Sequence, residues 1–169
     1  RSFPPEKGFL EGVRQLCTEN NIILIFDECS SGFRETYGGL HKKYGINPDM
    51  AIFGKTLGNG YAVTSVIGKR NIMEYAQNTF ISSTFWTERI GSAAALKVLE
   101  IMERDRTWLK VTELGKYLKS NLNKLSESFD LSISFNGLPA LISYKFESPD
   151  NLKYKTFITQ EMLKLGYLA

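Results

Sequence analysis

Five consecutive apolar residues, Ile22–Phe26, run directly into the carboxylate of Asp27. An apolar run of this length is typical of a strand buried on both faces, as in a parallel sheet covered by helices. Ahead of it, apolar residues recur at helical spacing from Leu10 to Cys17 and predict a helix. A helix followed by a fully buried strand indicates an α/β layered architecture.

The next segments continue this alternation. Met50–Phe53 and Ala62–Ile67 are short apolar runs next to glycine-containing loops, and we expect both to be strands. Residues 70–77 predict a short helix. From Glu88 to Met102 the sequence has helical periodicity and is apolar nearly all round, which predicts a largely buried helix.

The composition changes at a charged stretch, Arg104–Arg106, and we place a domain boundary there, between residues 1–104 and residues 105–169. The second of these segments predicts the start of a small α+β domain. Its expected elements are an amphipathic helix from Val111 to Leu125, strands at Leu131–Phe135 and Leu141–Phe146, and a helix at Lys155–Leu165 closed by Gly166.

Charge and cysteine content exclude several classes of protein. The net charge is only +3, and the 21 basic residues are scattered among 18 acidic ones, so we expect no nucleic-acid partner. Cys17, Cys29 and His41 do not have the spacing of a zinc site or a disulfide framework, so we expect no metal site and a reducing compartment. The longest apolar run is too short to cross a bilayer, so we expect a cytoplasmic protein with no membrane partner.

Two polar residues follow predicted strands closely. Asp27 comes after the first strand and Lys55, flanked by Gly54, after the second. Ligands of open α/β sheets bind beyond the carboxyl ends of the strands, so both side chains are expected at one crevice. A lysine that traps a carbonyl and a carboxylate that holds a pyridinium proton together describe a pyridoxal-phosphate site. Taken singly, each residue has a plainer explanation, because most lysines are solvated surface groups and aspartates at strand ends commonly cap the next helix or turn.

Four segments carry a family resemblance in their order and spacing. They are DECSSGFR at 27–34, YGINPD at 44–49, FGKTLGNGY at 53–61 and STFWTE at 83–88. Together they resemble the class III aminotransferases, a fold type I group that includes glutamate-1-semialdehyde aminomutase. The resemblance implies the three-layer, parallel-rich sheet of the large domain of fold type I pyridoxal-phosphate transferases, followed by part of a C-terminal small domain.

The resemblance also implies roles for individual residues. Lys55 would hold pyridoxal 5'-phosphate as a Schiff base, and Asp27 would pair with the pyridine nitrogen. Cys29 would pack on one face of the ring, where the family usually has an aliphatic residue. Thr84 would give its hydroxyl and N–H to the cofactor phosphate from the neighbouring subunit, which implies a homodimer. The main phosphate loop would precede Arg1, so we expect the 169-residue chain alone to be an incomplete enzyme.

Other residues near these motifs have plainer interpretations. Asn59 and Ala62 depart from the family's pattern in the loop after the lysine and affect its shape. Glu28 is expected in a structural salt bridge, and Arg34 in a structural or dimer contact. His41 is expected on the surface of a loop.

The resemblance implies a transaminase that moves an amino group between a small-molecule amine or amino acid and a carbonyl acceptor. An aminomutase that exchanges amino groups within one molecule stays open, as do racemisation, decarboxylation and a non-catalytic fragment that serves dimerisation. A nucleotide-binding dehydrogenase is weakly supported, because no G-x-G-x-x-G motif comes after the first strand.

Overall fold

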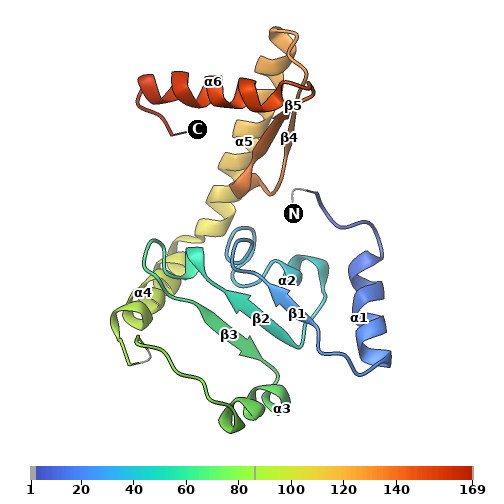
Figure 1. The fold of residues 1–169 in the computed structure, drawn as a ribbon, viewed down its shortest axis with the longest axis vertical. Helices are drawn as coiled ribbons and strands as arrows, with labels where there is room; N and C mark the ends of the chain where they lie inside the picture. Colours follow the sequence, from blue (N-terminus) through green and yellow to red (C-terminus); the bar gives the residue numbers. More distant parts are fainter. Residues whose placement is uncertain (1–2, 86, 169) are drawn as a thin grey trace. The chain divides into compact units, whose positions relative to one another are not determined.

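The computed structural model describes residues 3–85 and 87–168, which divide into two compact units (Figure 1). The first unit comprises residues 5–112, and the second comprises residues 113–168 with Phe3 and Pro4. The division falls inside the helix α5, Thr107–Ser128.

The elements of the first unit alternate as expected for an α/β layer. In chain order they are α1 (Phe9–Glu19), β1 (Ile25–Asp27), α2 (His41–Tyr44), β2 (Met50–Phe53), the 3₁₀ turn η1 (Lys55–Leu57), β3 (Ser65–Gly68), α3 (Arg70–Met73), the 3₁₀ turn η2 (Glu74–Asn78) and α4 (Ile90–Asp105). The predicted helix at Leu10–Cys17 and all three predicted strands are confirmed, and the first and third strands are shorter than expected.

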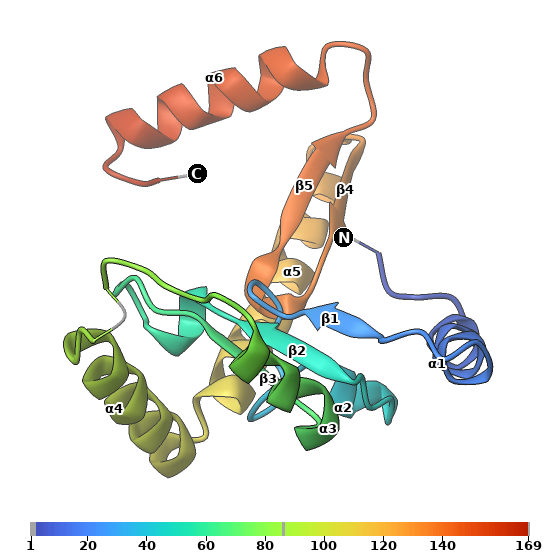
Figure 2. The ribbon, with the colours of Figure 1, turned by 60° about the horizontal axis from the view of Figure 1, so that its bottom comes forward.

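The three strands form one sheet with β2 in the middle, and Figure 2 shows them side by side. The β1 and β2 strands are parallel, with Asp27 opposite Ile52, whereas β3 runs antiparallel to β2. The described sheet is therefore mixed. Because β1 and β2 are parallel, their carboxyl ends meet at one edge, and the residues after those ends are brought together.

A small apolar cluster fixes the end of β2. Side chains alternate across a strand, and Ala51 and Phe53 are the buried residues of β2. They pack with Leu57 of η1, and the ring of Phe33 lies 5.4 Å from that of Phe53 between centroids. The turn that begins at Lys55 is thus held on the core directly behind the strand.

Two burial predictions are wrong in the first unit. The run Ile22–Phe26 was expected to be covered on both faces, yet Ile22, Ile23 and Ile25 are about half exposed. In the described part of the chain β1 is an edge strand that pairs only with β2. The helix α4 was expected to be largely buried, but Leu96 is 69% exposed. Among the described residues the core cluster covers only one face of α4, that of Ala95 and Leu99.

The second unit is a helix, a hairpin and a last helix. After α5 come β4 (Ile133–Asn136), the 3₁₀ turn η3 (Pro139–Leu141), β5 (Ser143–Phe146) and α6 (Asn151–Lys164). The predicted strand pair is confirmed as antiparallel, and Gly166, just after α6, is in the left-handed conformation with φ of 85°. The predicted apolar stripe of α5 is mostly exposed, at Val111, Leu114, Leu118 and Leu125.

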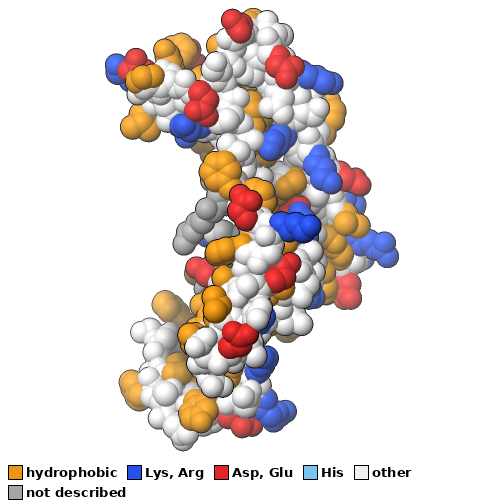
Figure 3. Space-filling model, turned by 90° about the vertical axis from the view of Figure 1, so that its right-hand side faces the viewer, with side chains coloured by type: hydrophobic (Ala, Val, Ile, Leu, Met, Phe, Trp, Pro, Cys, Tyr) orange, Lys and Arg blue, Asp and Glu red, His pale blue; other side chains and the backbone are white. Residues whose placement is uncertain are grey.

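The surface mixes side-chain types. On the face drawn in Figure 3, hydrophobic, basic and acidic side chains are interspersed. Among the described residues, no helix is both long enough and apolar enough to cross a bilayer.

One buried carboxylate joins several segments of the first unit. Asp49 is 7% exposed, and its oxygens accept hydrogen bonds from Lys69 Nζ at 2.6 Å, Leu24 N at 2.8 Å and Arg14 Nη1 at 2.8 Å. The hydrogen bond from Lys69 is the largest cause that holds the pKa of Asp49 far below its usual range, and the Leu24 N–H and Arg14 lower that pKa further. The residues that precede β1 and β2 are therefore tied to α1 and to the end of β3.

We predict that Asp49→Asn lowers the free energy of unfolding by about 3 kcal/mol, because it removes the charge that compensates two cations. The pKa of Asp49 is lower in the folded state, so its contribution is present above the unfolded pKa of about 4 and is lost as pH falls below it. The difference between wild type and variant, measured by urea denaturation, should shrink below that pH.

Glu100→Gln is the matched control, because it removes one carboxylate from an exposed pair with Lys97. It should leave the stability nearly unchanged. A similar loss of unfolding free energy in both variants would show that the hydrogen bonds of Asp49 contribute no more to stability than an exposed ion pair does.

Candidate active site

Lys55 occupies an uncommon backbone conformation at the carboxyl end of β2. It begins η1 with φ of 43°, in the left-handed region that non-glycine residues seldom adopt, while Gly54 before it is extended. Such conformations concentrate at functional sites. The side chain is exposed, and Lys55 Nζ donates a hydrogen bond to Ser30 Oγ at 2.5 Å.

Asp27 lies at the same edge of the sheet. It is the last residue of β1 rather than the residue after the strand, and it is solvent-exposed. Its Oδ1 accepts a hydrogen bond from Cys29 N at 3.0 Å, which holds the turn that leaves β1. A carboxylate from one strand and an amine from just after the next are thus presented at one edge, as the sequence predicts.

Cys29 is close to both of these groups. Its sulfur also lies near Gly54, where an added Cβ would be 3.4 Å from Cys29 Sγ. Burial raises the pKa of the Cys29 thiol, the hydrogen bond and charge of Asp27 raise it further, and the charge of Lys55 acts in the opposite direction. Asp27, Cys29 and Lys55 therefore form one electrostatically coupled group.

Thr84 lies outside this group. It is exposed in the segment that joins η2 to α4, where Phe85 N donates to Ser83 Oγ. Trp86 of the same motif lies outside the described residues.

An open cavity of about 450 Å³ adjoins Lys55 and continues along the loop after it. Its lining residues are Lys55, Gly60, Tyr61, Ala62, Val63 and Thr64. Two close approaches shape this wall. A Cβ at Gly58 would overlap the carbonyl oxygen of Tyr61, and one at Gly91 of α4 would lie 3.3 Å from Tyr61 Cε1. Burial raises the pKa of the Tyr61 hydroxyl, and the neighbouring Glu88 carboxylate, which accepts from Ile90 N at 2.8 Å, raises it further.

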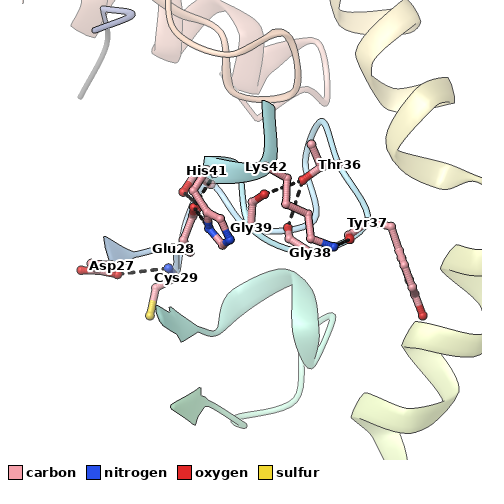
Figure 4. Close-up of polar contacts among 10 residues, drawn as sticks. Asp27, Glu28, Cys29, Thr36, Tyr37, Gly38, Gly39, His41 and Lys42 are labelled. Atoms are coloured by element: carbon pink, nitrogen blue, oxygen red, sulfur yellow. Dashed lines mark hydrogen bonds and ion pairs between the residues drawn. The ribbon is translucent and has the colours of Figure 1, made fainter. Parts of the chain in front are cut away.

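The loop after β1 is anchored by a contact between Glu28 and His41, and the sequence indicated only the first of these residues (Figure 4). Glu28 was expected in a structural salt bridge, and its partner is His41, with Glu28 Oε1 3.0 Å from His41 Nδ1 and 2.9 Å from His41 N. The expectation of a surface histidine is wrong, since the His41 side chain is only 12% exposed. Its burial results from the fold of the loop between Glu28 and His41, which spacing along the sequence does not reveal.

Ser30 was also missed by the sequence reasoning. It stands in the first family motif, but the motif gave no reason to single it out from its neighbours. Only the fold shows that its hydroxyl meets the amine of Lys55, 25 residues further on.

The described side chains fit a carbonyl cofactor with a basic ring nitrogen. An exposed amine on a strained turn can bind the carbonyl, and an exposed carboxylate on the neighbouring strand can bind the ring nitrogen. An α/β protein that holds a carbonyl cofactor through a lysine requires an arrangement of this kind. Comparison with known sequences agrees: residues 2–168 match the family Aminotransferase class-III, and the chain belongs to this family.

Relatives within the family carry several names. The chain is 37% identical to 3-aminobutyryl-CoA aminotransferase of Cloacimonas acidaminovorans, over 95% of the chain and 39% of that protein. It is 34% identical to glutamate-1-semialdehyde 2,1-aminomutase 2 of Lachnoclostridium phytofermentans, over 90% of the chain and 37% of that protein. The chain thus spans about two fifths of the length of these relatives.

Solved structures give the same fold. Acetylornithine aminotransferase of Elizabethkingia anophelis matches with a TM-score of 0.86 at 27% identity, over 98% of this chain and 44% of that one. The FumI protein of Sphingopyxis sp. MTA144, solved as its PLP internal aldimine form, matches with a TM-score of 0.79 at 25% identity, over 85% of this chain and 34% of that one. The fold is therefore that of the fold type I pyridoxal-phosphate transferases, and the cofactor of the family is pyridoxal phosphate.

We predict that Asp27→Asn lowers the pKa of the Cys29 thiol, because it removes the carboxylate that raises it. At a fixed pH near 8, more thiolate is then present and alkylation by iodoacetamide becomes faster. Peptide mapping separates the rate at Cys29 from that at Cys17, which serves as an internal control. An unchanged Cys29 rate would contradict the coupling of these groups.

Proposed function

We propose that the protein is a transaminase that moves an amino group between a small-molecule amine or amino acid and a carbonyl acceptor, with pyridoxal phosphate held by Lys55. The observation that carries this proposal is the left-handed lysine at the end of β2, with the carboxylate of Asp27 at the same edge. Family membership supports it.

In this proposal each residue has a defined task. Bound pyridoxal phosphate supplies an aldehyde that condenses with amines and a ring that accepts electrons. Lys55 Nζ would hold the cofactor through its aldehyde and, once free, would act as the base that takes the proton from the substrate carbon next to nitrogen. Asp27 would keep the ring nitrogen protonated, since a carboxylate stabilises a nearby cation. Cys29 would contribute an apolar contact to the ring.

Thr84 and the exposed apolar residues near it support a homodimer. Phe80, Ile81 and Phe85 are all more than half exposed in the segment before α4. Burial of such a segment against a second subunit would give the Thr84 hydroxyl and N–H to the partner's cofactor phosphate. The proposal is thus a dimer in which each chain contributes to both sites.

Domain organisation and location complete the proposal. We assign residues 1–104 to the cofactor-binding large domain and residues 105–169 to the C-terminal small domain. The division into compact units, which falls within α5, supports a boundary in this region. Cys17 and Cys29 are both free thiols, which suits the cytoplasm.

The second candidate is intramolecular amino exchange of the glutamate-1-semialdehyde aminomutase type. It is supported by the 34% identity to a relative of that name. Lys55 and Asp27 would have the same tasks, and the two functions differ in whether the amino group leaves with a second molecule.

The first test addresses Lys55. The longest natural form of the protein, loaded with pyridoxal phosphate, should show a visible absorption band that sodium borohydride abolishes while it fixes the cofactor covalently. Peptide mapping should find the adduct on Lys55, and Lys55→Ala should lack the band. A label on another lysine would end this assignment.

The second test addresses Asp27 and the fate of the amino group. Asp27→Asn should still bind the cofactor but should transaminate slower by about three powers of ten, because it loses charge stabilisation that develops in the transition state. An amine donor given alone to the wild type should yield pyridoxamine phosphate and one equivalent of carbonyl product. Rearrangement of glutamate-1-semialdehyde without a second substrate would favour the aminomutase.

A further inference from the structure

Glu28 is a buried carboxylate that lies between two residues of the site. It is 4% exposed, and both of its oxygens are occupied by donors from the loop after β1. Oε1 accepts from His41 N at 2.9 Å and lies 3.0 Å from His41 Nδ1, and Oε2 accepts a short hydrogen bond from the Ser31 hydroxyl. The carboxylate is therefore satisfied by groups that come from 3 and 13 residues away.

The backbone of Glu28 is fixed as well. Its N–H donates to Ile52 O at 2.8 Å, and its carbonyl accepts from Gly32 N at 2.8 Å. The first bond continues the pairing of β1 with β2 by one residue, so successive side chains still point to opposite sides. Figure 4 shows the Glu28 side chain turned toward His41, and the Cys29 sulfur turned away from it.

The absence of a side chain at Gly39 gives space for the contact between Glu28 and His41. A Cβ added there would overlap the imidazole ring of His41 and lie 3.1 Å from Glu28 Oε1. Thr36 closes the same loop, since its hydroxyl donates to Gly39 O at 2.8 Å. The contact between His41 and Glu28 therefore leaves no space for a side chain at residue 39.

We propose that Glu28 and His41 are a positioning pair that sets the placement of Asp27 and Cys29 at the cofactor ring. A buried carboxylate that loses its donors moves toward water, because an uncompensated charge is costly in the interior. Glu28 is covalently joined to Asp27 and Cys29, so a displacement that strains its backbone hydrogen bonds to Ile52 and Gly32 moves both of them. The proposal rests on the proposed function for its catalytic consequence, but the geometry of the turn can be measured without the cofactor.

The first readout is the alkylation rate of Cys29 without cofactor, in a Cys17→Ser background. This rate depends on the placement of Asp27 and Lys55 around the thiol. The second readout is the pH midpoint at which the visible band of the lysine-bound cofactor titrates in the longest natural form of the protein. If the pair only stabilised the fold, its removal would lower the melting temperature. It would change neither the alkylation rate nor the pH midpoint.

His41→Leu should change the Cys29 alkylation rate by about tenfold and lower kcat by a similar factor, the scale expected for misplacement of a catalytic group by a fraction of an ångström. It should also shift the pH midpoint of the band. In His41→Asn the alkylation rate and kcat should stay within about twofold of the wild type and the pH midpoint should stay near it, because the asparagine NH₂ can replace Nδ1 as a donor. Ser31→Ala removes only the donor to Oε2 and is a milder second variant if His41→Leu does not fold.

Tyr37→Phe is the matched control. It removes one hydrogen bond from the same loop, from the Tyr37 hydroxyl to Leu99 O, without touching Glu28. It should lower the melting temperature and leave the alkylation rate and the band unchanged.

If His41→Leu and Ser31→Ala behave like Tyr37→Phe in both readouts, the positioning role is wrong while the proposed function stands. If the wild type shows no lysine-bound cofactor band, the proposed function fails, and the alkylation rates still decide whether the pair positions the turn.

Discussion

The geometry of the first unit depends on one buried charge, that of Asp49. Its carboxylate binds the backbone ahead of β1 through Leu24 and the side chains of Arg14 and Lys69. These bonds fix where β1 and β2 start relative to each other, and the parallel register results. A register is an all-or-none property of a strand pair, because a shift by one residue turns every side chain to the other face. The placement of Asp27 and Lys55 at one edge is set from the opposite end of the strands.

The site combines a rigid scaffold with a strained turn. Phe53 and Leu57 are buried on either side of Lys55 in the sequence, so the lysine backbone is held in the left-handed region by packing. Asp27 is held by the β1 ladder and by its turn with Cys29. Such an arrangement orients the two groups before any ligand binds, and it confines the ordering cost of binding to the flexible end of the lysine.

Much of this arrangement could be predicted from the sequence, for reasons that are local. Apolar runs ending at Asp27 and just before Lys55 indicate strands, and parallel strands bring their ends together. The family motifs then identified the cofactor and the class of enzyme. Contacts across long separations could not be predicted, such as Ser30 with Lys55 or Glu28 with His41, since they depend on how the intervening loop folds. The burial of α4 and β1 was overestimated. An apolar segment tends to be buried, but its composition does not show which residues it packs against.

The close approach of Gly58 to the carbonyl of Tyr61 has a consequence for how such a site can diversify. A side chain at residue 58 would push the backbone of the cavity wall away, so this part of the loop cannot change by simple substitution. The side chains that line the cavity also lie close to glycines, Tyr61 and Val63 to Gly91 and Thr64 to Gly54. A change in the shape of this cavity therefore requires paired changes, one in a lining side chain and one in the glycine beside it.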